Sequence, residues 1–173
     1  LGFEPYGLDI SPTISDLKDY NVKQVDFIND EAPYTEEKFD FIFSKSVVEH
    51  LQEPSGYLSA IYQSLEDGGK AVVMTPSWSH TYWGPFYIDY THVTPFTAYS
   101  LQSALEMAGF ENVNVKYFYQ LPVLWKYPWL TPFIKLFSKL PLPYAPYNKV
   151  PWSIANKFNK LIRFSKEPML IAI

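Results

Sequence analysis

Short apolar segments that end in polar or acidic side chains recur along this 173-residue chain, and segments with a helical pattern lie between several of them. Strands separated by helices of about a dozen residues form right-handed βαβ units. We therefore expect an α/β fold with a mostly parallel sheet. The predicted strands are residues 5–8, 22–25, 39–44, 71–74, 113–119 and 169–173.

Two longer helices are expected between these strands. The first begins near Pro54 and ends at Gly68, and the second begins after Thr97 and ends at Gly109. A loop of roughly twenty residues, rich in Trp, Tyr and His, follows the fourth strand, and a loop of that length is more often functional than not. The first helix is supported by apolar positions with the spacing i, i+3, i+4 and i+7, at Leu58, Ile61, Tyr62 and Leu65.

The charge of the chain is divided unevenly. Residues 1–111 contain five basic and seventeen acidic side chains, a net charge of −12, whereas residues 112–173 contain nine and one, a net charge of +8. Such an asymmetry indicates an anionic partner: a membrane, a phosphate-bearing substrate or a nucleic acid. The absence of cysteine excludes disulfides, a thiolate metal site and a cysteine nucleophile. No apolar run is long enough for a plain membrane span.

Ligands of parallel sheets bind beyond the carboxyl ends of the strands, where this chain places several polar residues. Asp9 could accept hydrogen bonds from two ribose hydroxyls, or only cap the turn before Ser11; Asp26 could contact an adenine amino group, or be a turn residue. The adjacent Glu49 and His50 could ligate a metal, form an acid/base pair, or only open a helix. His92 could be a general base or orient a substrate, or be an ordinary surface residue.

Four stretches resemble the class I S-adenosylmethionine-dependent methyltransferases, especially the small-molecule group called type 11 or type 23. They are Gly-Leu-Asp-Ile-Ser at 7–11, residues 39–51 with their Val-Val-Glu-His-Leu end, residues 65–76, and residues 92–110 with His-Val-Thr-Pro-Phe-Thr. The resemblance implies a Rossmann-like methyltransferase sheet with a C-terminal antiparallel hairpin. It also implies that the cofactor is S-adenosyl-L-methionine.

The resemblance assigns cofactor contacts to strand-end positions. Asp9, with its neighbour Ile10, matches the ribose-binding position, and the pair Asp26 and Phe27 matches the adenine-binding position. The methionine part of the cofactor is expected at Ser44 and Lys45.

For the reaction itself, we expect His92, or alternatively His50, to take a proton from an acceptor hydroxyl, and Trp83, Tyr87 and Tyr90 to line the acceptor pocket. Ubiquinone-type O-methyltransferases carry a metal-binding carboxylate three residues before the Glu of the Glu-His pair. Ser46 occupies that position here, so we expect no metal site.

The chain departs from the family at its start. The family's first strand, its Gly-x-Gly-x-Gly loop and its first helix would precede Leu1, so the N-terminal βα unit is missing from residues 1–173. We expect a C-terminal part of a longer enzyme, in which the family's second and fourth strands have no partner between them. We further expect residues 1–173 alone to bind the cofactor poorly and to be inactive.

A basic, aromatic segment, residues 120–167, separates the last two predicted strands; we call it the basic insertion. We expect residues 1–119 and 168–173 to form the methyltransferase core. Amphipathic helices with basic and aromatic side chains are typical of membrane-surface elements, but a lid over the substrate has the same pattern. Nucleic acid is disfavoured, because the aromatics lie on apolar helix faces instead of alternating with cations along a groove.

The sequence thus predicts methyl transfer to a small-molecule or lipid-linked acceptor by a cytoplasmic protein, membrane-associated if the insertion lies on a bilayer. Two alternatives stay open. A nucleotide-dependent oxidoreductase or epimerase could also hold a ribose at Asp9. A non-catalytic Rossmann-like module could serve only to present the basic insertion.

Overall fold

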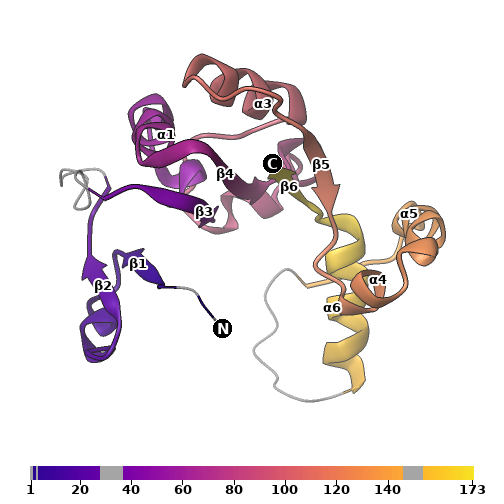
Figure 1. The fold of residues 1–173 in the computed structure, drawn as a ribbon. Coiled ribbons are helices and arrows are strands. Elements are labelled where there is room, and N and C mark those ends of the chain that lie inside the picture. The colour runs from indigo at the N-terminus through magenta and orange to yellow at the C-terminus, as the bar shows by residue number, and fades with distance from the viewer. Residues whose placement is uncertain (1, 3, 28–36, 146–153) are drawn as a thin grey trace.

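The computed structural model describes residues 2, 4–27, 37–145 and 154–173. Its larger sheet has the strand order β3-β4-β6-β5 and is mixed (Figure 1). Strand β3 is parallel to β4, whereas β6 is antiparallel to both β4 and β5. The predicted α/β class and the C-terminal antiparallel hairpin are confirmed. The strands are β3 (Phe39–Lys45), β4 (Leu65–Pro76), β5 (Val115–Phe118) and β6 (Met169–Ala172).

The first two strands form a separate parallel sheet of β1 (Tyr6–Asp9) and β2 (Asn21–Gln24), joined by the short helix η1 (Pro12–Asp16). Among the described residues no strand pairs with the outer edge of β3, where Phe41 and Phe43 are more than half exposed. The prediction that these two parts of the sheet lack a strand between them is therefore confirmed for this part of the chain.

Helices α1 (Pro54–Gln63) and α3 (Ala98–Met107) cover one face of the larger sheet, as Figure 1 shows. Leu58, Leu101 and Leu105 from these helices form one buried cluster with Val73 and Leu170 from the sheet. Helix α3 begins with a capping box, in which the side chains of Thr97 and Ser100 each accept a hydrogen bond from the other's backbone N–H. It ends before Gly109, whose φ of 107° lies in a region that glycine readily adopts.

The chain between α1 and β4 corrects one prediction. The helix was expected to reach Gly68, but α1 ends at Gln63 and β4 already begins at Leu65. The Phe39 N–H donates to the carbonyl of Ser64 (2.9 Å), which ties this segment to the start of β3. A Cβ atom at Gly69 would lie 3.0 Å from the Phe39 carbonyl oxygen, so this glycine permits a close backbone approach and does not end the helix.

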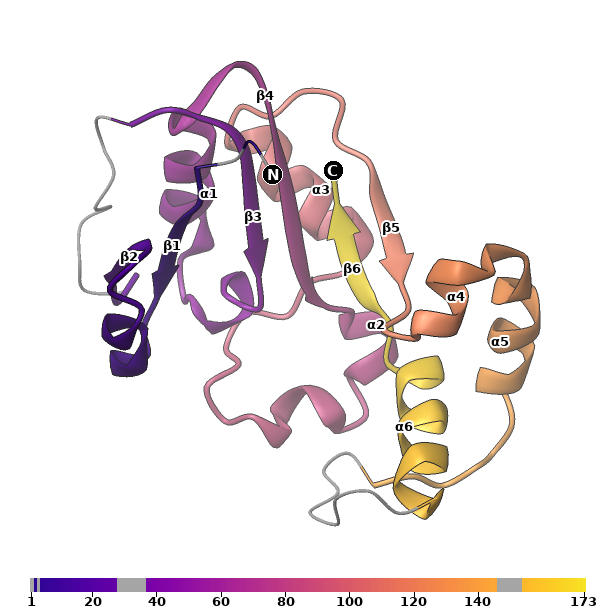
Figure 2. The same ribbon diagram turned by 60° about the horizontal axis from the view of Figure 1, so that its bottom comes forward.

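The aromatic loop after β4 contains two short helices, α2 (Trp78–Thr81) and η3 (Pro85–Ile88), and η2 (Val48–His50) follows β3. The helices of the basic insertion lie together beside the end of β5 and the start of β6 (Figure 2). None of the helices in the described ranges is long and apolar enough to cross a membrane. The insertion contains α4 (Pro122–Lys126), η4 (Pro128–Leu130), α5 (Thr131–Ser138) and α6 (Ile154–Lys166).

Candidate active site

Backbone hydrogen bonds bring the aromatic loop back to the end of β3. The N–H groups of Val93 and Thr94 both donate to the carbonyl of Glu49, at 2.8 and 3.0 Å. This anchor places His92 beside His50, with ring centroids 4.7 Å apart. Residues that are 42 positions apart in the sequence thus form one cluster at the carboxyl ends of β3 and β4.

The hydrogen bonds of the two histidines fix which ring nitrogen carries the proton. His92 Nδ1 lies 2.7 Å from the carbonyl oxygen of Phe86, which can only accept, so Nδ1 is the protonated nitrogen. His50 Nδ1 lies 2.8 Å from the Thr91 hydroxyl, whose own proton goes to Asp89 at 2.6 Å. Each neutral ring therefore keeps a lone pair on Nε2, which is what a general base needs.

Two carboxylates flank these histidines in different environments. Glu49 is fully buried; one of its oxygens accepts from the Thr75 hydroxyl (3.0 Å) and the other, Oε1, has no hydrogen-bond partner. Burial raises the pKa of Glu49 above its usual value, although the Thr75 hydrogen bond and the two histidines oppose this shift. The hydrogen bonds from Thr91 hold the pKa of Asp89 below its usual value.

A cavity of about 210 Å³ opens at this cluster, and Glu49 and His92 are among the residues that line it. Arg163 and Glu167 at the end of α6 form part of its wall, with Arg163 Nε 3.0 Å from Glu167 Oε2. Sequence reasoning missed this contribution of the basic insertion. The i,i+4 spacing of the two charges just before the last strand is the signal that could have revealed it.

The cluster also contains groups that could hold a metal ion. One ligand atom from each of Glu49, His50 and His92 lies within 4.8 Å of the others. The expectation of no metal rested on Ser46 alone, before His92 was known to lie beside the Glu-His pair. That expectation stays a prediction.

The predicted ribose-binding position lies at the end of the smaller sheet. Asp9 Oδ1 accepts the N–H of Ser11 (2.7 Å), so this side chain does cap the turn. A carboxylate has acceptor sites beyond this one bond, and the exposed side chain leaves room for a ribose hydroxyl. The Asp9 carbonyl accepts the Val25 N–H (2.9 Å), which brings Asp9 and Ile10 close to Asp26.

An aromatic contact connects the adenine-binding and methionine-binding predictions. The ring of Phe27 packs edge-on against Tyr57 (4.9 Å between centroids), and the Tyr57 hydroxyl lies 2.8 Å from Ser44 Oγ. Tyr57, whose pKa is raised by burial, was not among the predicted residues. Lys45, next to Ser44, lines the 210 Å³ cavity. Tyr57 therefore connects two of the predicted cofactor positions, Phe27 and Ser44.

The three predicted acceptor residues lie in different places. Trp83 lines a second cavity and is described below. Tyr87 packs edge-on against Trp78 and Phe86, with centroids 5.7 and 5.1 Å away. Tyr90 is 90% exposed. Their role in acceptor binding stays a prediction.

Solved structures of similar fold are S-adenosylmethionine-dependent enzymes. A SAM-dependent methyltransferase from Archaeoglobus fulgidus aligns with 99% of this chain and 76% of its own, at a TM-score of 0.59 and 23% identity. A phosphoethanolamine N-methyltransferase 2 of Haemonchus contortus, in complex with phosphomonomethylethanolamine and S-adenosylhomocysteine, aligns with 99% of this chain and 43% of its own. Its TM-score is 0.53 and its identity 16%. At these identities the likeness establishes the fold alone.

Sequence comparison identifies the family. A ubiquinone biosynthesis O-methyltransferase of Ruegeria sp. (strain TM1040) is 32% identical over 53% of this chain, and the match spans 42% of that relative's length. The family described as "Methyltransferase domain" matches residues 1–115, which include Glu49, His50 and His92. The chain therefore belongs to this methyltransferase domain family.

Proposed function

We propose that the intact protein transfers a methyl group from S-adenosyl-L-methionine to a small-molecule acceptor. The observation that carries the proposal is the lone pair on His92 Nε2, held beside the buried Glu49 in a cavity at the strand ends of a methyltransferase domain. The family match favours methyl transfer over a nucleotide-dependent oxidoreductase or epimerase, and over a non-catalytic module. The S-adenosylhomocysteine bound in the Haemonchus structure, which is the product left when S-adenosylmethionine loses its methyl group, supports the same choice.

In this proposal S-adenosylmethionine supplies an electrophilic methyl group, and the side chains of this chain hold and activate the acceptor. His92 takes the proton of an acceptor hydroxyl on Nε2, while its Nδ1–H stays bound to the Phe86 carbonyl and keeps the ring in place. The carboxylate of Asp89, whose Oδ2 lies 4.0 Å from His92 Nε2, stabilises the imidazolium that results, with Glu49 on the buried side of the cluster. Asp9 accepts hydrogen bonds from the cofactor ribose, and Ser44 and Lys45 flank its methionine part.

Calorimetric titration of the intact protein with S-adenosylmethionine tests the cofactor assignment. Hydrogen bonds to a charged group contribute about 1.5–3 kcal/mol, so Asp9→Ala is expected to weaken binding at least about tenfold. Asp16→Ala is the matched control, because Asp16 is also exposed but belongs to η1. Equal affinities of the two variants would refute the role of Asp9.

We also propose that the acceptor is lipid-linked and that α4 to α5 lies on an anionic membrane surface. The exposed fractions of Trp129, Phe133 and Leu136 are 67%, 62% and 66%, and α5 has no buried residue. Lys126, Lys135 and Lys139 provide positive charge on the same segment. An apolar surface with adjacent cations matches the interface of an anionic leaflet.

Helix α6 supports the lid interpretation for its own part of the insertion. Its residues Ile162 and Ser165 are buried, and Arg163 lines the catalytic cavity. We therefore propose that α6 covers the acceptor while α4 and α5 contact the bilayer. Co-sedimentation with phosphatidylglycerol vesicles at low salt tests the second part. No binding there, or equal binding to neutral phosphatidylcholine vesicles, would contradict it.

A further inference from the structure

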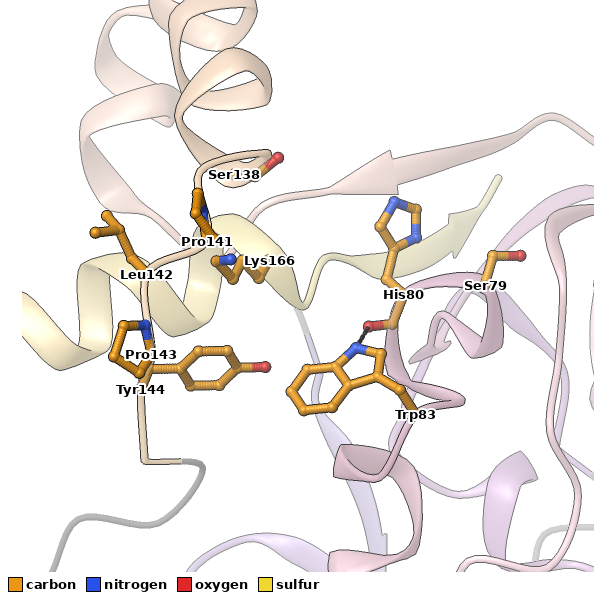
Figure 3. Close-up of a pocket in the computed structure, with 9 residues that line it drawn as sticks. All are labelled: Ser79, His80, Trp83, Ser138, Pro141, Leu142, Pro143, Tyr144 and Lys166. Carbon is orange, nitrogen blue, oxygen red and sulfur yellow. Dashed lines mark hydrogen bonds between the residues drawn. The ribbon is translucent and has the colours of Figure 1, made fainter.

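A second cavity, of about 640 Å³, lies between the aromatic loop and the basic insertion (Figure 3). His80 and Trp83 line it from the methyltransferase core. Leu142, Tyr144 and Lys166 line it from the insertion, and Figure 3 shows the Tyr144 hydroxyl directed toward Trp83. The volume is typical of a site for a small organic molecule.

Many polar groups in the wall of this cavity already have protein partners. Trp83 Nε1 donates to the His80 carbonyl (3.1 Å), the Tyr144 hydroxyl to Glu167 (2.6 Å) and Lys166 Nζ to the Leu140 carbonyl (2.6 Å). The His80 ring bonds Ser77 at 2.9 Å, and burial lowers the pKa of His80, which keeps it uncharged at neutral pH. The wall therefore offers mainly carbon surface, with no acidic side chain among the described residues that form it.

Adjacent residues of the chain line the two cavities. Thr81 and Glu167 line the catalytic cavity, and their sequence neighbours His80 and Lys166 line the larger one. Ser138, at the end of α5, lines the side of the larger cavity toward the proposed membrane surface. A chain attached to a head group at His92 would therefore have to pass these residues to enter the larger cavity.

We propose that the 640 Å³ cavity is the binding site for the hydrocarbon chain of the acceptor. This inference rests on the proposed function and deepens it. Burial of each methylene of the chain strengthens binding about fourfold, so a chain of several carbons determines affinity here, whereas the smaller cavity selects the head group.

The test uses binding of 11-(dansylamino)undecanoic acid to the intact protein, followed by dansyl fluorescence, and needs no methyl transfer. We expect saturable binding, with displacement by 1-dodecanol or by farnesol distinguishing a linear chain from an isoprenoid. Ser79→Phe fills the cavity from an exposed position and is expected to weaken probe binding about tenfold or more. Ser55→Phe, on the exposed surface of α1, is the matched control and leaves binding unchanged.

Two results would overturn the inference. One is undiminished probe binding by Ser79→Phe, and by Ser138→Phe, which fills the cavity from the opposite wall and replaces the first variant if that one does not fold. The other is loss of probe binding only in Trp129→Glu/Phe133→Glu, which would place the probe on the outer surface of the insertion. Failure of the proposed function is separate: it would appear as no S-adenosylmethionine binding in calorimetry, whatever the probe does.

Discussion

The cluster of Glu49, His50 and His92 differs from the basic insertion in how far its side chains are buried and hydrogen-bonded. In the cluster, His50, His92 and Glu49 are at least partly buried, and their ring nitrogens or oxygens are fixed by neighbours such as Thr75 and Thr91. In the insertion, α5 has no buried residue and keeps the large apolar side chains of Phe133 and Leu136 exposed. The side chains of the cluster are therefore preorganised in the absence of a ligand. The insertion leaves apolar area for a partner to cover.

Helix α6 belongs to both regions, because its C-terminal end lines the cavity at the Glu49, His50 and His92 cluster. Its end contributes Arg163 and Glu167 to the catalytic cavity, and Glu167 also accepts the hydroxyl of Tyr144 from the wall of the larger cavity. Glu167 thus receives one hydrogen bond from Tyr144 and another from Arg163 of α6. A substitution in the insertion can therefore affect the predicted acceptor site, although it does not contact the predicted cofactor-binding residues.

The largest expected effect comes from the base in the cluster. His92→Ala is expected to lower kcat about 10²–10⁴-fold for a hydroxyl acceptor, because proton removal loses its Nε2 lone pair. Binding of S-adenosylmethionine should be unchanged, since Asp9 and Ser44 are untouched. Tyr99→Ala, which removes an exposed ring from α3 outside both cavities, is the control. Full activity of His92→Ala would assign the base elsewhere, with His50 the next candidate.

Charge reversal in the insertion tests the other region. Each cation near an anionic leaflet contributes about 1 kcal/mol, so Lys135→Glu/Lys139→Glu is expected to weaken vesicle binding about 30-fold or more. Lys18→Glu/Lys23→Glu changes the charge of the exposed smaller sheet region by the same amount and should have little effect. Equal losses in the two double variants would mean that net charge, and not the α5 surface, controls binding.

The buried carboxylate should make stability depend on pH. Because the pKa of Glu49 is raised in the folded state, its stabilising contribution is complete below its unfolded value, near 4.5, and is lost as the pH rises through the folded value. Glu49→Gln cannot ionise, so its free energy of unfolding is expected to rise relative to that of the wild type as the pH increases from 5 to 8. Urea unfolding at pH 5 and pH 8 measures this, with the exposed Glu66→Gln as control. A gap between variant and wild type that does not change with pH would contradict the assignment.

Substitutions at the N-termini of α3 and α5 are expected to change the free energy of unfolding by smaller amounts. Thr97→Ala removes the capping box of α3 and is expected to cost about 1 kcal/mol of unfolding free energy. Thr131 opens α5 but makes no capping bond; it donates to the Pro128 carbonyl (2.7 Å). We expect Thr131→Ala to cost less than about 0.5 kcal/mol. A larger loss for Thr131→Ala than for Thr97→Ala, in thermal unfolding, would show that the insertion is part of the cooperative core.

Local sequence signals were sufficient for much of the fold. The β3 strand follows from an almost continuous apolar run, and the limits of α3 follow from Thr97 and Gly109. The predicted end of α1 was wrong because Gly68 and Gly69 resemble helix stops, whereas Gly69 permits a close approach of the backbone to Phe39. A contact between strands distant in the chain decided that boundary, and no local pattern contains it.

The candidate site was predictable residue by residue but not as an arrangement. The strand-end rule picked out Glu49, His50 and His92, yet their meeting depends on backbone bonds from Val93 and Thr94 to Glu49. Which nitrogen of His92 is protonated depends on the carbonyl of Phe86, a group that every residue has. The tertiary structure determines these contacts and protonation sites, so the residue types alone do not predict them.

Divalent metal ions are expected to have the smallest effect on the reaction. Mg²⁺ prefers an octahedral set of oxygens, whereas the cluster offers one buried carboxylate and two imidazoles. Three residues before Glu49, Ser46 stands in place of a second carboxylate. Millimolar Mg²⁺ and EDTA should therefore leave kcat unchanged. Zn²⁺ suits imidazole nitrogen and would inhibit, because it would occupy the Nε2 lone pair that His92 needs as a base. If EDTA abolished activity and Mg²⁺ restored it, Glu49 and both rings would be metal ligands, and the proton would have to leave the acceptor by another route.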